Sequence, residues 1–364
     1  MRVLISGYYG FGNLGDEAVL TSIIEGLRQR APNIGLTVLS AQPQLTTELN
    51  NVRAVHRYDL FRIFSELEES AIFLSGGGTL FQDTTSRRSF WYYIGMVGLA
   101  KLWGKKIMIF AQGFGPLRGP LDRLAARLVL DRVDLITLRD ETALNELRRL
   151  GVRNQNVFVT ADPTFSLKQM DKSEGRKILS LEGVPVAGPL VGIAVRSLAR
   201  RADGEQLAKL LAAALDRLKQ KHGWEPVFLL FQCPEDMAAT SKIVKAMKEG
   251  SHVVFKICSP AEMLAIFSCF EFVISLRLHA LVFAAQHDVP MLALSYDPKV
   301  SSFAGLVDQP CLKIGELDKL EAVLGKAVSE RVALKGRLSA ARRELSAKAG
   351  RSFDLFFDYF GKAS

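Results

Sequence analysis

The sequence predicts an α/β protein with two domains built on mostly parallel sheets. The chain has 364 residues, more than a single hydrophobic core usually serves. Apolar segments of strand length alternate with amphipathic helical segments along most of the chain, a pattern typical of parallel sheets covered by helices on both faces. The alternation breaks between residues 163 and 190, so we expect the first domain to end there.

The expected strands of the first half are short apolar runs, several of which end in glycine or polar residues. They lie at 2–6, 36–40, 52–55, 70–74, 106–110, 133–138 and 157–160. Helical patterns separate most of these runs. Because ligands of open α/β sheets bind at the carboxyl ends of the strands, we searched these ends for functional residues.

The second half repeats the alternation, with expected strands at 191–196, 225–231, 252–256, 271–275 and 290–295. The polar stretch from 168 to 175 is the best candidate for a linker. The sequence therefore predicts a first domain over 1–168, a linker over 169–189, a second domain over 190–340 and a terminal helix over 341–364.

Beyond Gly315 the pattern is almost wholly helical and ends in five aromatic residues among eight: Phe353, Phe356, Phe357, Tyr359 and Phe360. A helix this apolar is expected to dock on the body of the protein, with a crossing back to the first domain as one route. Weak contact with a membrane is the alternative for this tail.

The formal net charge of +9 favours an anionic partner. Nucleic acid is disfavoured because no basic helix interleaved with aromatic residues is visible. Anionic small molecules fit, as does a lipid-linked phosphate at a membrane surface. The four cysteines, Cys233, Cys258, Cys269 and Cys311, show no ligand spacing, so no metal site is predicted.

The sequence gives no sign of export or of membrane insertion. No apolar run reaches the roughly 18 residues that span a bilayer, and the N-terminus leads straight into a strand without a signal pattern. We therefore expect a cytoplasmic protein, with peripheral contact at the inner face of the cell membrane as a further expectation.

The segment from Gly7 to Glu17 imitates a dinucleotide-binding loop, because Gly10, Gly12 and Gly15 fit G-x-G-x-x-G between a strand and a helix. The expected second strand, however, carries no carboxylate to bind a ribose. Asp16 and Glu17 would also compete with a pyrophosphate at the helix N-terminus. We expect the loop to contact a different ligand, on the acceptor side of the site, through Gly10, Asn13, Gly15, Asp16 and Glu17.

Two further glycine-bearing loops follow strands. The first contains Gly76, Gly77 and Gly78 with Gln82 and Asp83 downstream, and the second contains Gln112 and Gly113. Glycine lets the backbone approach a ligand closely. Three such loops at strand ends predict an open crevice, although tight turns alone remain the alternative.

Four strand ends deliver cations or a histidine. Arg139 follows a strand of the first domain, where it suits a carboxylate or phosphate unless it pairs with Asp140 or Asp162. In the second domain, His279 and Lys299 leave successive strands and are expected to face one cleft. The additional cations expected at that edge are Arg196 and Arg277.

These motifs together resemble the polysaccharide pyruvyl transferase family, and most closely its bacterial cell-surface-anchoring branch of the CsaB type. The resemblance rests on the Gly-x-x-Asn-x-Gly-Asp-Glu segment, the Ser-Gly-Gly-Gly loop, Gln112-Gly113-Phe114-Gly115-Pro116, Arg139-Asp140, Asp162-Pro163, Arg277-Leu278-His279 and Lys299. It spans nearly the whole chain. Each motif is weak alone, but their order and spacing are fairly specific.

The resemblance implies a GT-B-like fold of two Rossmann-like domains with the site in the cleft between them. It also implies transfer of pyruvate from phosphoenolpyruvate onto a sugar diol, typically as a 4,6-ketal on N-acetylmannosamine of a lipid-linked cell-wall polymer, with Arg139, His279 and Lys299 as donor-binding and catalytic residues. The residues support this chemistry independently, because phosphoenolpyruvate carries about three negative charges and several cations are at hand. No cofactor is then expected.

Two other functions remain open at this point. A glycosyltransferase with a nucleotide-sugar donor uses the same architecture and the same kind of cationic site, and a fold alone does not determine function. The second alternative is a scaffold that binds polysaccharide or lipid without catalysis. The three glycine loops together with Arg139, His279 and Lys299 argue against the scaffold.

Overall fold

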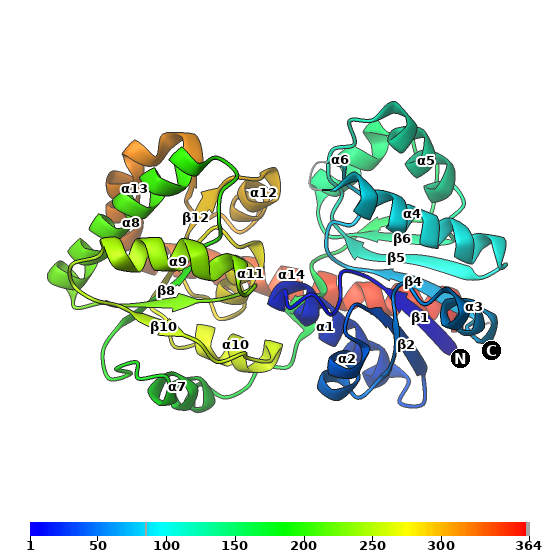
Figure 1. Ribbon diagram of the computed structural model, residues 1–364, viewed down its shortest axis with the longest axis horizontal. Helices are drawn as coiled ribbons and strands as arrows, with labels where there is room; N and C mark the ends of the chain where they lie inside the picture. Colours follow the sequence, from blue (N-terminus) through cyan, green and yellow to red (C-terminus); the bar gives the residue numbers. More distant parts are fainter. Residues whose placement is uncertain (84–85, 362–364) are drawn as a thin grey trace. The chain divides into compact units, whose positions relative to one another are not determined.

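The computed structural model describes residues 1–83 and 86–361 of the chain. The chain forms two compact units, each with its own parallel sheet (Figure 1). Unit 1 comprises Met1–Leu167 together with Leu345–Ser364, and unit 2 comprises Lys168–Glu344. The predicted α/β class with two parallel-sheet domains is confirmed.

Unit 1 contains a seven-stranded parallel sheet. Its second and third strands extend the sheet to one side of β1, and the later strands extend it to the other side. The strands pair in the order β3-β2-β1-β4-β5-β6-β7, so β1 and β4 flank the point where the order switches. In open α/β sheets such a point is the usual place for a ligand. The strand bounds are β1 (Arg2–Ser6), β2 (Gly35–Ser40), β3 (Arg53–His56), β4 (Ile72–Gly76), β5 (Lys106–Gln112), β6 (Leu135–Leu138) and β7 (Val157–Val159).

Helices cover both faces of this sheet because side chains alternate along each strand. In β1, Val3 and Ile5 join one buried cluster and Leu4 joins another. Residues of α1 and the end of α14 pack in the first cluster, and residues of α3, α4, α5 and α6 pack in the second. The bounds are α1 (Leu14–Arg30), α2 (Pro43–Asn50), α3 (Leu60–Glu69), α4 (Arg87–Leu102), α5 (Pro120–Leu130), α6 (Glu141–Arg149), the 3-10 helix η1 (Pro163–Ser166) and α14 (Arg331–Phe360).

Unit 2 contains a six-stranded parallel sheet in the order β10-β9-β8-β11-β12-β13. Its strands are β8 (Leu190–Ala194), β9 (Glu225–Leu229), β10 (His252–Val254), β11 (Phe272–Ser275), β12 (Met291–Ser295) and β13 (Cys311–Lys313). Its helices are α7 (Lys172–Leu181), α8 (Arg201–His222), α9 (Glu235–Ala246), α10 (Pro260–Phe267), α11 (Leu278–Gln286), α12 (Pro298–Leu306), the 3-10 helix η2 (Ile314–Lys319) and α13 (Leu320–Ser329). Sequence periodicity missed β13, since three residues with one buried side chain are too short for the pattern.

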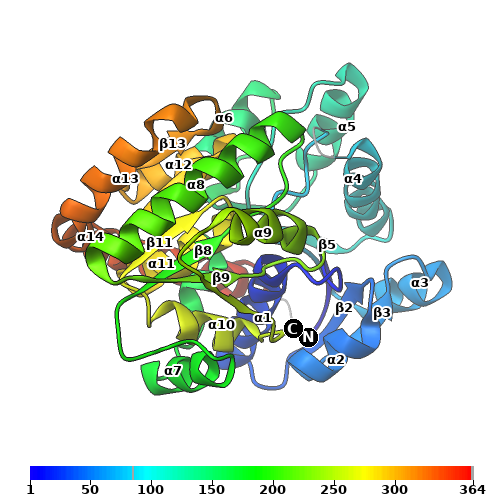
Figure 2. The ribbon, with the colours of Figure 1, turned by 60° about the vertical axis from the view of Figure 1, so that its left-hand side comes forward.

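The segment expected to be a linker contains helix α7 and belongs to unit 2. Asp171 caps this helix by accepting a hydrogen bond from the Ser173 N–H at 2.7 Å. Figure 2 shows α7 beside α10, and a Cβ atom at Gly175 would overlap the backbone carbonyl of Ala265. Of the polar stretch that suggested a linker, residues 168–171 lead into α7 and residues 172–174 are its first turn, which is why the sequence pattern looked broken there.

Helix α14 contributes to both units, because residues 331–344 belong to unit 2 and residues 345–360 to unit 1. In unit 1 the side chains of Phe353, Phe356 and Phe360 are at most 3% exposed. The Phe353 ring packs 5.0 Å from the ring of Phe110, and Gly26 of α1 leaves room for it. An ion pair of 2.8 Å between Arg30 and Asp354 fixes the outer side.

These contacts correct the alternative of a membrane-binding tail. Three of its five aromatic side chains are core residues of unit 1, so they are not available to a bilayer. Within the described residues, no helix has the length and hydrophobicity needed to cross a membrane.

Replacing Phe353 by alanine should lower the free energy of unfolding of unit 1 by about 3–5 kcal/mol, the usual cost of a cavity left by a buried phenylalanine. Denaturant unfolding followed by circular dichroism measures the loss. Val332→Ala is the matched control, because Val332 lies on the same helix with its side chain 77% exposed, and it should change the value by no more than about 0.5 kcal/mol. A loss below 1 kcal/mol for Phe353→Ala would contradict the docking of this helix.

Candidate functional site

The first glycine loop, residues 7–13, is held close to the end of β2. Gly10 adopts φ +77°, and a Cβ atom there would overlap Ser40 Oγ and lie 2.5 Å from the Gln42 backbone nitrogen. The Gly10 N–H donates to Glu17 Oε1 at 2.8 Å. Asn13 caps α1, since its Oδ1 accepts from the Gly15 N–H at 3.1 Å. Part of this motif therefore serves the loop's own conformation.

The second glycine loop packs directly on α1. Gly77 and Gly78 adopt φ +53° and +68°, a region that favours glycine. A Cβ atom at Gly77 would overlap the side chain of Val19. A Cβ atom at Gly78 would lie 3.1 Å from Asp16 Oδ1. Asp16, in the first turn of α1, thus reaches the backbone of the second loop.

The third glycine loop meets the second and also meets Arg139. The Gly113 N–H donates to the Gly78 carbonyl at 2.8 Å. A Cβ atom at Gly113 would lie 2.6 Å from Arg139 Nη2 and 2.8 Å from Thr79 Oγ1. The structure therefore brings the three predicted loops and Arg139 together at the carboxyl edge of the β1-β4-β5-β6 strands.

Arg139 has two carboxylate neighbours at long range, and its side chain is 9% exposed. Its Nε lies 3.4 Å from Asp140 Oδ2, and its Nη1 lies 3.7 Å from Asp162 Oδ2. Short charge-assisted hydrogen bonds measure about 2.7–2.9 Å. The Asp140 carboxylate also caps α6 by accepting from the Ala143 N–H at 2.8 Å. The expected ion-pair alternative is thus present, but only with loose geometry.

Three residues expected to contact a ligand have structural partners in unit 1. Gln112 is fully buried and donates from Nε2 to Ser75 Oγ at 2.8 Å, which links β5 to β4. Asp83 Oδ2 accepts from the N–H groups of Arg118 and Gly119 at 2.7 and 2.9 Å. Gln82 packs against Gly115. These side chains hold the β5–α5 loop, and burial removes Gln112 from the groups that a ligand can reach.

In unit 2, the strand order places the ends of β9, β8, β11 and β12 side by side. The expectation that His279 and Lys299 leave adjacent strands is confirmed, because β11 pairs with β12. His279 is the second residue of α11 and is partly buried. Lys299 lies in the first turn of α12, with Nζ 3.6 Å from Asp297 Oδ2 and a side chain 30% exposed.

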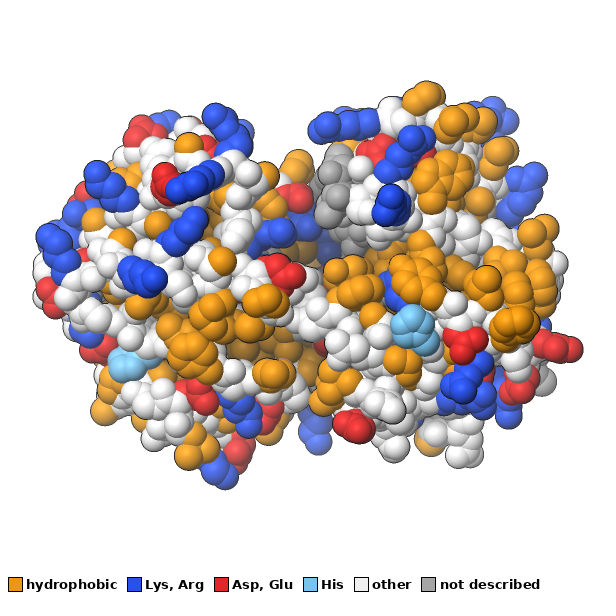
Figure 3. Space-filling model, in the orientation of Figure 1, with side chains coloured by type: hydrophobic (Ala, Val, Ile, Leu, Met, Phe, Trp, Pro, Cys, Tyr) orange, Lys and Arg blue, Asp and Glu red, His pale blue; other side chains and the backbone are white. Residues whose placement is uncertain are grey.

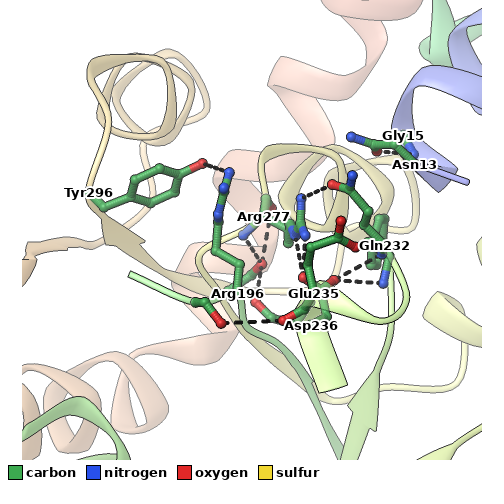
Figure 4. A network of polar contacts seen from close by, with 12 residues as sticks. Asn13, Gly15, Arg196, Gln232, Glu235, Asp236, Arg277 and Tyr296 are labelled. Carbon is green, nitrogen blue, oxygen red and sulfur yellow. Dashed lines mark hydrogen bonds and ion pairs between the residues drawn. The ribbon is translucent and has the colours of Figure 1, made fainter. Parts of the chain in front are cut away.

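Arg196 also lies at this edge, after β8, and contacts Tyr296. Its Nη1 donates to the Tyr296 hydroxyl at 2.8 Å, and its guanidinium carbon lies 5.0 Å from the centre of the Tyr296 ring (Figure 4). Tyr296 follows β12 directly, two residues before α12 begins. Neither of these contacts is with a carboxylate, so they do not balance the positive charge of Arg196, which can bind an anion.

Arg277, in contrast, forms a buried ion pair. Its Nε donates to Asp236 Oδ1 at 3.1 Å, its Nη2 also pairs with that oxygen, and its Nη1 donates to Gln232 at 3.3 Å (Figure 4). The Asp236 side chain is fully buried and accepts two backbone N–H groups as well. Arg277 was expected to bind the donor; its hydrogen bonds instead tie the start of α11 to the start of α9, and so position His279.

Sequence reasoning missed Arg57, which supports the first glycine loop. Arg57 follows β3 and is 4% exposed. Its guanidinium lies 4.1 Å from the ring centre of Tyr92 and 5.0 Å from that of Phe11, and it donates to the Tyr93 hydroxyl at 3.1 Å. The sequence shows an arginine at a strand end next to a tyrosine, which could have indicated this role. The aromatic side chains that contact Arg57 come from distant segments, so the sequence alone could not identify them.

Burial raises the pKa of Glu17 from an ordinary 4.5 to about 7, although the hydrogen bond from the Gly10 N–H opposes the shift. The neighbouring charge of Asp16 adds to it. A carboxyl group that titrates near neutral pH beside the three loops is a candidate for function, because such shifts cluster at active sites.

The pKa of Glu17 predicts a pH dependence of stability. Between pH 4.5 and about 7 the folded protein keeps a proton that the unfolded chain has released, so stability present below pH 4.5 is lost as the pH rises through 7. The melting temperature of wild type minus that of Glu17→Gln should therefore fall from pH 5 to pH 8. Glu48→Gln, at an exposed position of α2, should show no such trend, and a flat difference for Glu17→Gln would contradict the assignment.

A family model described as polysaccharide pyruvyl transferase matches residues 13–298 of the chain. The match begins at the cap of α1 and ends at the start of α12. It therefore includes the second and third glycine loops, Arg139, His279 and every strand except β1 and β13, whereas Gly10 precedes it. Among curated proteins, the amylovoran biosynthesis protein AmsJ of Erwinia amylovora is 20% identical over 353 residues, which cover 82% of this chain and 84% of AmsJ.

Solved structures with a similar fold include a complex with UDP, a UDP-GlcNAc 2-epimerase and a glycosyltransferase. The complex of Staphylococcus aureus MnaA with UDP has a TM-score of 0.67 at 12% identity and covers 100% of this chain and 97% of its own. A UDP-GlcNAc 2-epimerase from Neisseria meningitidis gives 0.66 at 12% identity with full coverage of both chains. A glycosyltransferase from Rickettsia africae gives 0.65 at 11% identity, covering 100% and 99%. These likenesses establish the GT-B-like fold and no activity.

Proposed function

Because this chain belongs to the polysaccharide pyruvyl transferase family, we propose that it transfers the pyruvate unit of phosphoenolpyruvate onto a sugar diol as a 4,6-ketal and releases phosphate. The observation that carries the proposal is that the family match includes Arg139 at the edge of one sheet and Arg196 and His279 at the edge of the other, with Lys299 one residue beyond its end. We propose as acceptor a lipid-linked cell-wall precursor ending in N-acetylmannosamine, as the resemblance to the cell-surface-anchoring branch implies.

The cations of the two edges suit the charges of this donor. Phosphoenolpyruvate combines a carboxylate with a phosphate. A planar guanidinium binds such groups with two parallel hydrogen bonds, and an ammonium acts as a point charge. In the proposed mechanism Arg139 binds the donor, Lys299 neutralises the departing phosphate and Arg196 adds a third positive charge. Arg277 has a positioning role, because its charge is already balanced by Asp236.

The reaction needs one proton delivered and two removed. His279 gives a proton to the methylene carbon of the enol; a sugar hydroxyl attacks the neighbouring carbon, and its proton returns to His279. The bond from that carbon to the phosphate oxygen then breaks, and phosphate leaves. The second hydroxyl then attacks the same carbon and closes the ketal. Its proton is taken up by the released phosphate. Fixed cations stabilise the charge that develops as phosphate departs.

The test is to incubate the protein with phosphoenolpyruvate and a panel of lipid-linked disaccharides, and to measure phosphate release and product mass. His279→Ala should lower the rate by roughly 10²–10⁴, the usual contribution of general acid-base catalysis, with an unchanged circular dichroism spectrum. His222→Ala is the matched control, since His222 is an exposed residue at the end of α8. A His279→Ala variant with full activity would remove His279 from the mechanism.

A glycosyltransferase with a nucleotide-sugar donor is the second candidate, favoured by the fold shared with nucleotide-binding proteins such as MnaA. Thermal-shift measurements separate the two. Stabilisation by phosphoenolpyruvate and none by nucleotide sugars supports the pyruvyl transferase, and the reverse result supports the glycosyltransferase.

Asp16 should contribute to binding of the acceptor, because its side chain lies at the Gly78 backbone beside the three loops. Asp16→Asn is expected to raise the KM for the acceptor roughly tenfold, the value of a hydrogen bond to a charged group, with little change in the KM for phosphoenolpyruvate. Asp203→Asn, which alters an acid in the first turn of α8, should change neither. An unchanged KM for the acceptor in the Asp16→Asn variant would show that Asp16 does not bind the acceptor and that the loop beside it has only a structural role. Asn13 is less suitable for this test, because it caps α1.

A further inference from the structure

Helices α3, α4 and α5 carry large apolar side chains on their exposed sides. Figure 3 shows hydrophobic side chains over these helices of unit 1, with lysine and arginine side chains among them and at their margins. We call this set the outer helical face. It consists of Leu60, Phe61, Phe64, Trp91, Leu102, Trp103, Leu121, Leu124 and Leu128, whose exposed fractions range from 36% to 90%. Exposed apolar side chains of this number on one part of a surface indicate a candidate interaction site.

Helix α5 shows the pattern most clearly. Leu121, Leu124 and Leu128 are 63%, 51% and 47% exposed, and their spacing of three and four residues places them on one side of the helix. The opposite side is also apolar, with Ala126 and Leu130 fully buried. The exposed leucines are therefore not needed to attach α5 to its own core.

The charged residues around this leucine stripe are mostly positive, with the partly exposed Asp131 after the end of α5 as an exception. The only acid of α5, Asp122, is fully buried and pairs with Arg87 Nε at 2.8 Å. The exposed cations beside the stripe are Arg88, Arg118, Arg123 and Arg132. Within residues 1–83 and 86–361, none of these four forms an ion pair with a carboxylate. The surface thus combines exposed leucine with uncompensated positive charge.

Aromatic side chains extend the surface across α3 and α4. Phe61 is 90% exposed, and the rings of Phe64 and Trp103 stack at 5.0 Å between their centres. Tryptophan is enriched where apolar lipid meets water, because its ring is apolar and its N–H is polar. Leucine, tryptophan and arginine on adjoining helices are the composition of a protein surface that lies in the bilayer interface.

We propose that the outer helical face binds the surface of a bilayer that contains anionic phospholipids. The leucine and aromatic side chains enter the boundary between headgroups and acyl chains, and the arginines lie at the lipid phosphates. A protein partner fits less well, because leucine, which supplies five of the nine apolar side chains of this face, is under-represented among the residues that dominate protein–protein binding. This surface takes the role that the aromatic tail, buried in unit 1, does not have.

The test is co-sedimentation of the full chain with phosphatidylcholine vesicles, with and without phosphatidylglycerol. Wild type should bind the anionic vesicles and be released by high salt, because exposed charges are screened. The triple variant Leu121→Gln/Leu124→Gln/Leu128→Gln should lose binding roughly tenfold or more, since buried methylene groups supply the apolar part of the affinity. Arg118→Gln/Arg123→Gln should weaken binding only to the anionic vesicles.

Two matched controls use exposed residues outside this face. Leu181→Gln/Val332→Gln removes side chains that are 79% and 77% exposed, and Lys335→Gln/Arg343→Gln removes two exposed cations of α14. Both should bind like wild type. Absence of wild-type binding to anionic vesicles overturns the proposal, as does self-association of wild type that the leucine triple variant abolishes. The assay needs neither donor nor acceptor, so its outcome is independent of the proposed transferase activity.

Discussion

Parallel pairing of strands is the constraint on which the other features of this protein depend. Every ladder of both sheets is parallel, so each strand must be followed by a connection that returns to the opposite edge. All carboxyl ends consequently meet at one edge of each sheet. Residues such as Gly10, Gly78, Gly113 and Arg139 are far apart in sequence, and only this geometry makes them neighbours.

In unit 1 the glycine loops are packed against one another as well as placed at one edge. Gly77 has no room for a side chain beside Val19, and Gly113 has none beside Arg139 and Thr79. The loops therefore form a closely packed backbone surface with an acid, Asp16, near Gly78 and a cation, Arg139, near Gly113. An acid beside the second glycine loop and a cation beside the third suit a substrate with both hydroxyl and anionic groups. The buried Arg57 contacts Phe11 of the first loop and so helps to hold this loop in place.

In unit 2, burial separates cations with similar positions in the sequence. Arg277 and Lys299 both stand at strand ends, yet the Arg277 charge is balanced by the fully buried Asp236, whereas Lys299 lies 3.6 Å from a partly exposed carboxylate. Separating the partners of a buried ion pair leaves an uncompensated charge, which is unfavourable. The Arg277 side chain is therefore held in its position by Asp236. Lys299 and Arg196 are the cations of that edge whose contacts leave their side chains able to turn toward an anion, because neither contacts a fully buried carboxylate.

The sequence by itself determined the class of fold, twelve of the strands, and the strand ends at which Arg139 in unit 1 and His279 and Lys299 in unit 2 lie, because hydrophobic periodicity and glycine spacing are local properties. It also carried the family resemblance. Only the tertiary structure decided that residues 172–181 form a helix of unit 2, that Gln112 is buried and that Phe353 belongs to the core of unit 1. Each of these depends on partners distant in the chain, such as Ala265, Ser75 and Phe110. A local pattern reports what a side chain prefers, whereas its partner is fixed by the packing of the whole unit.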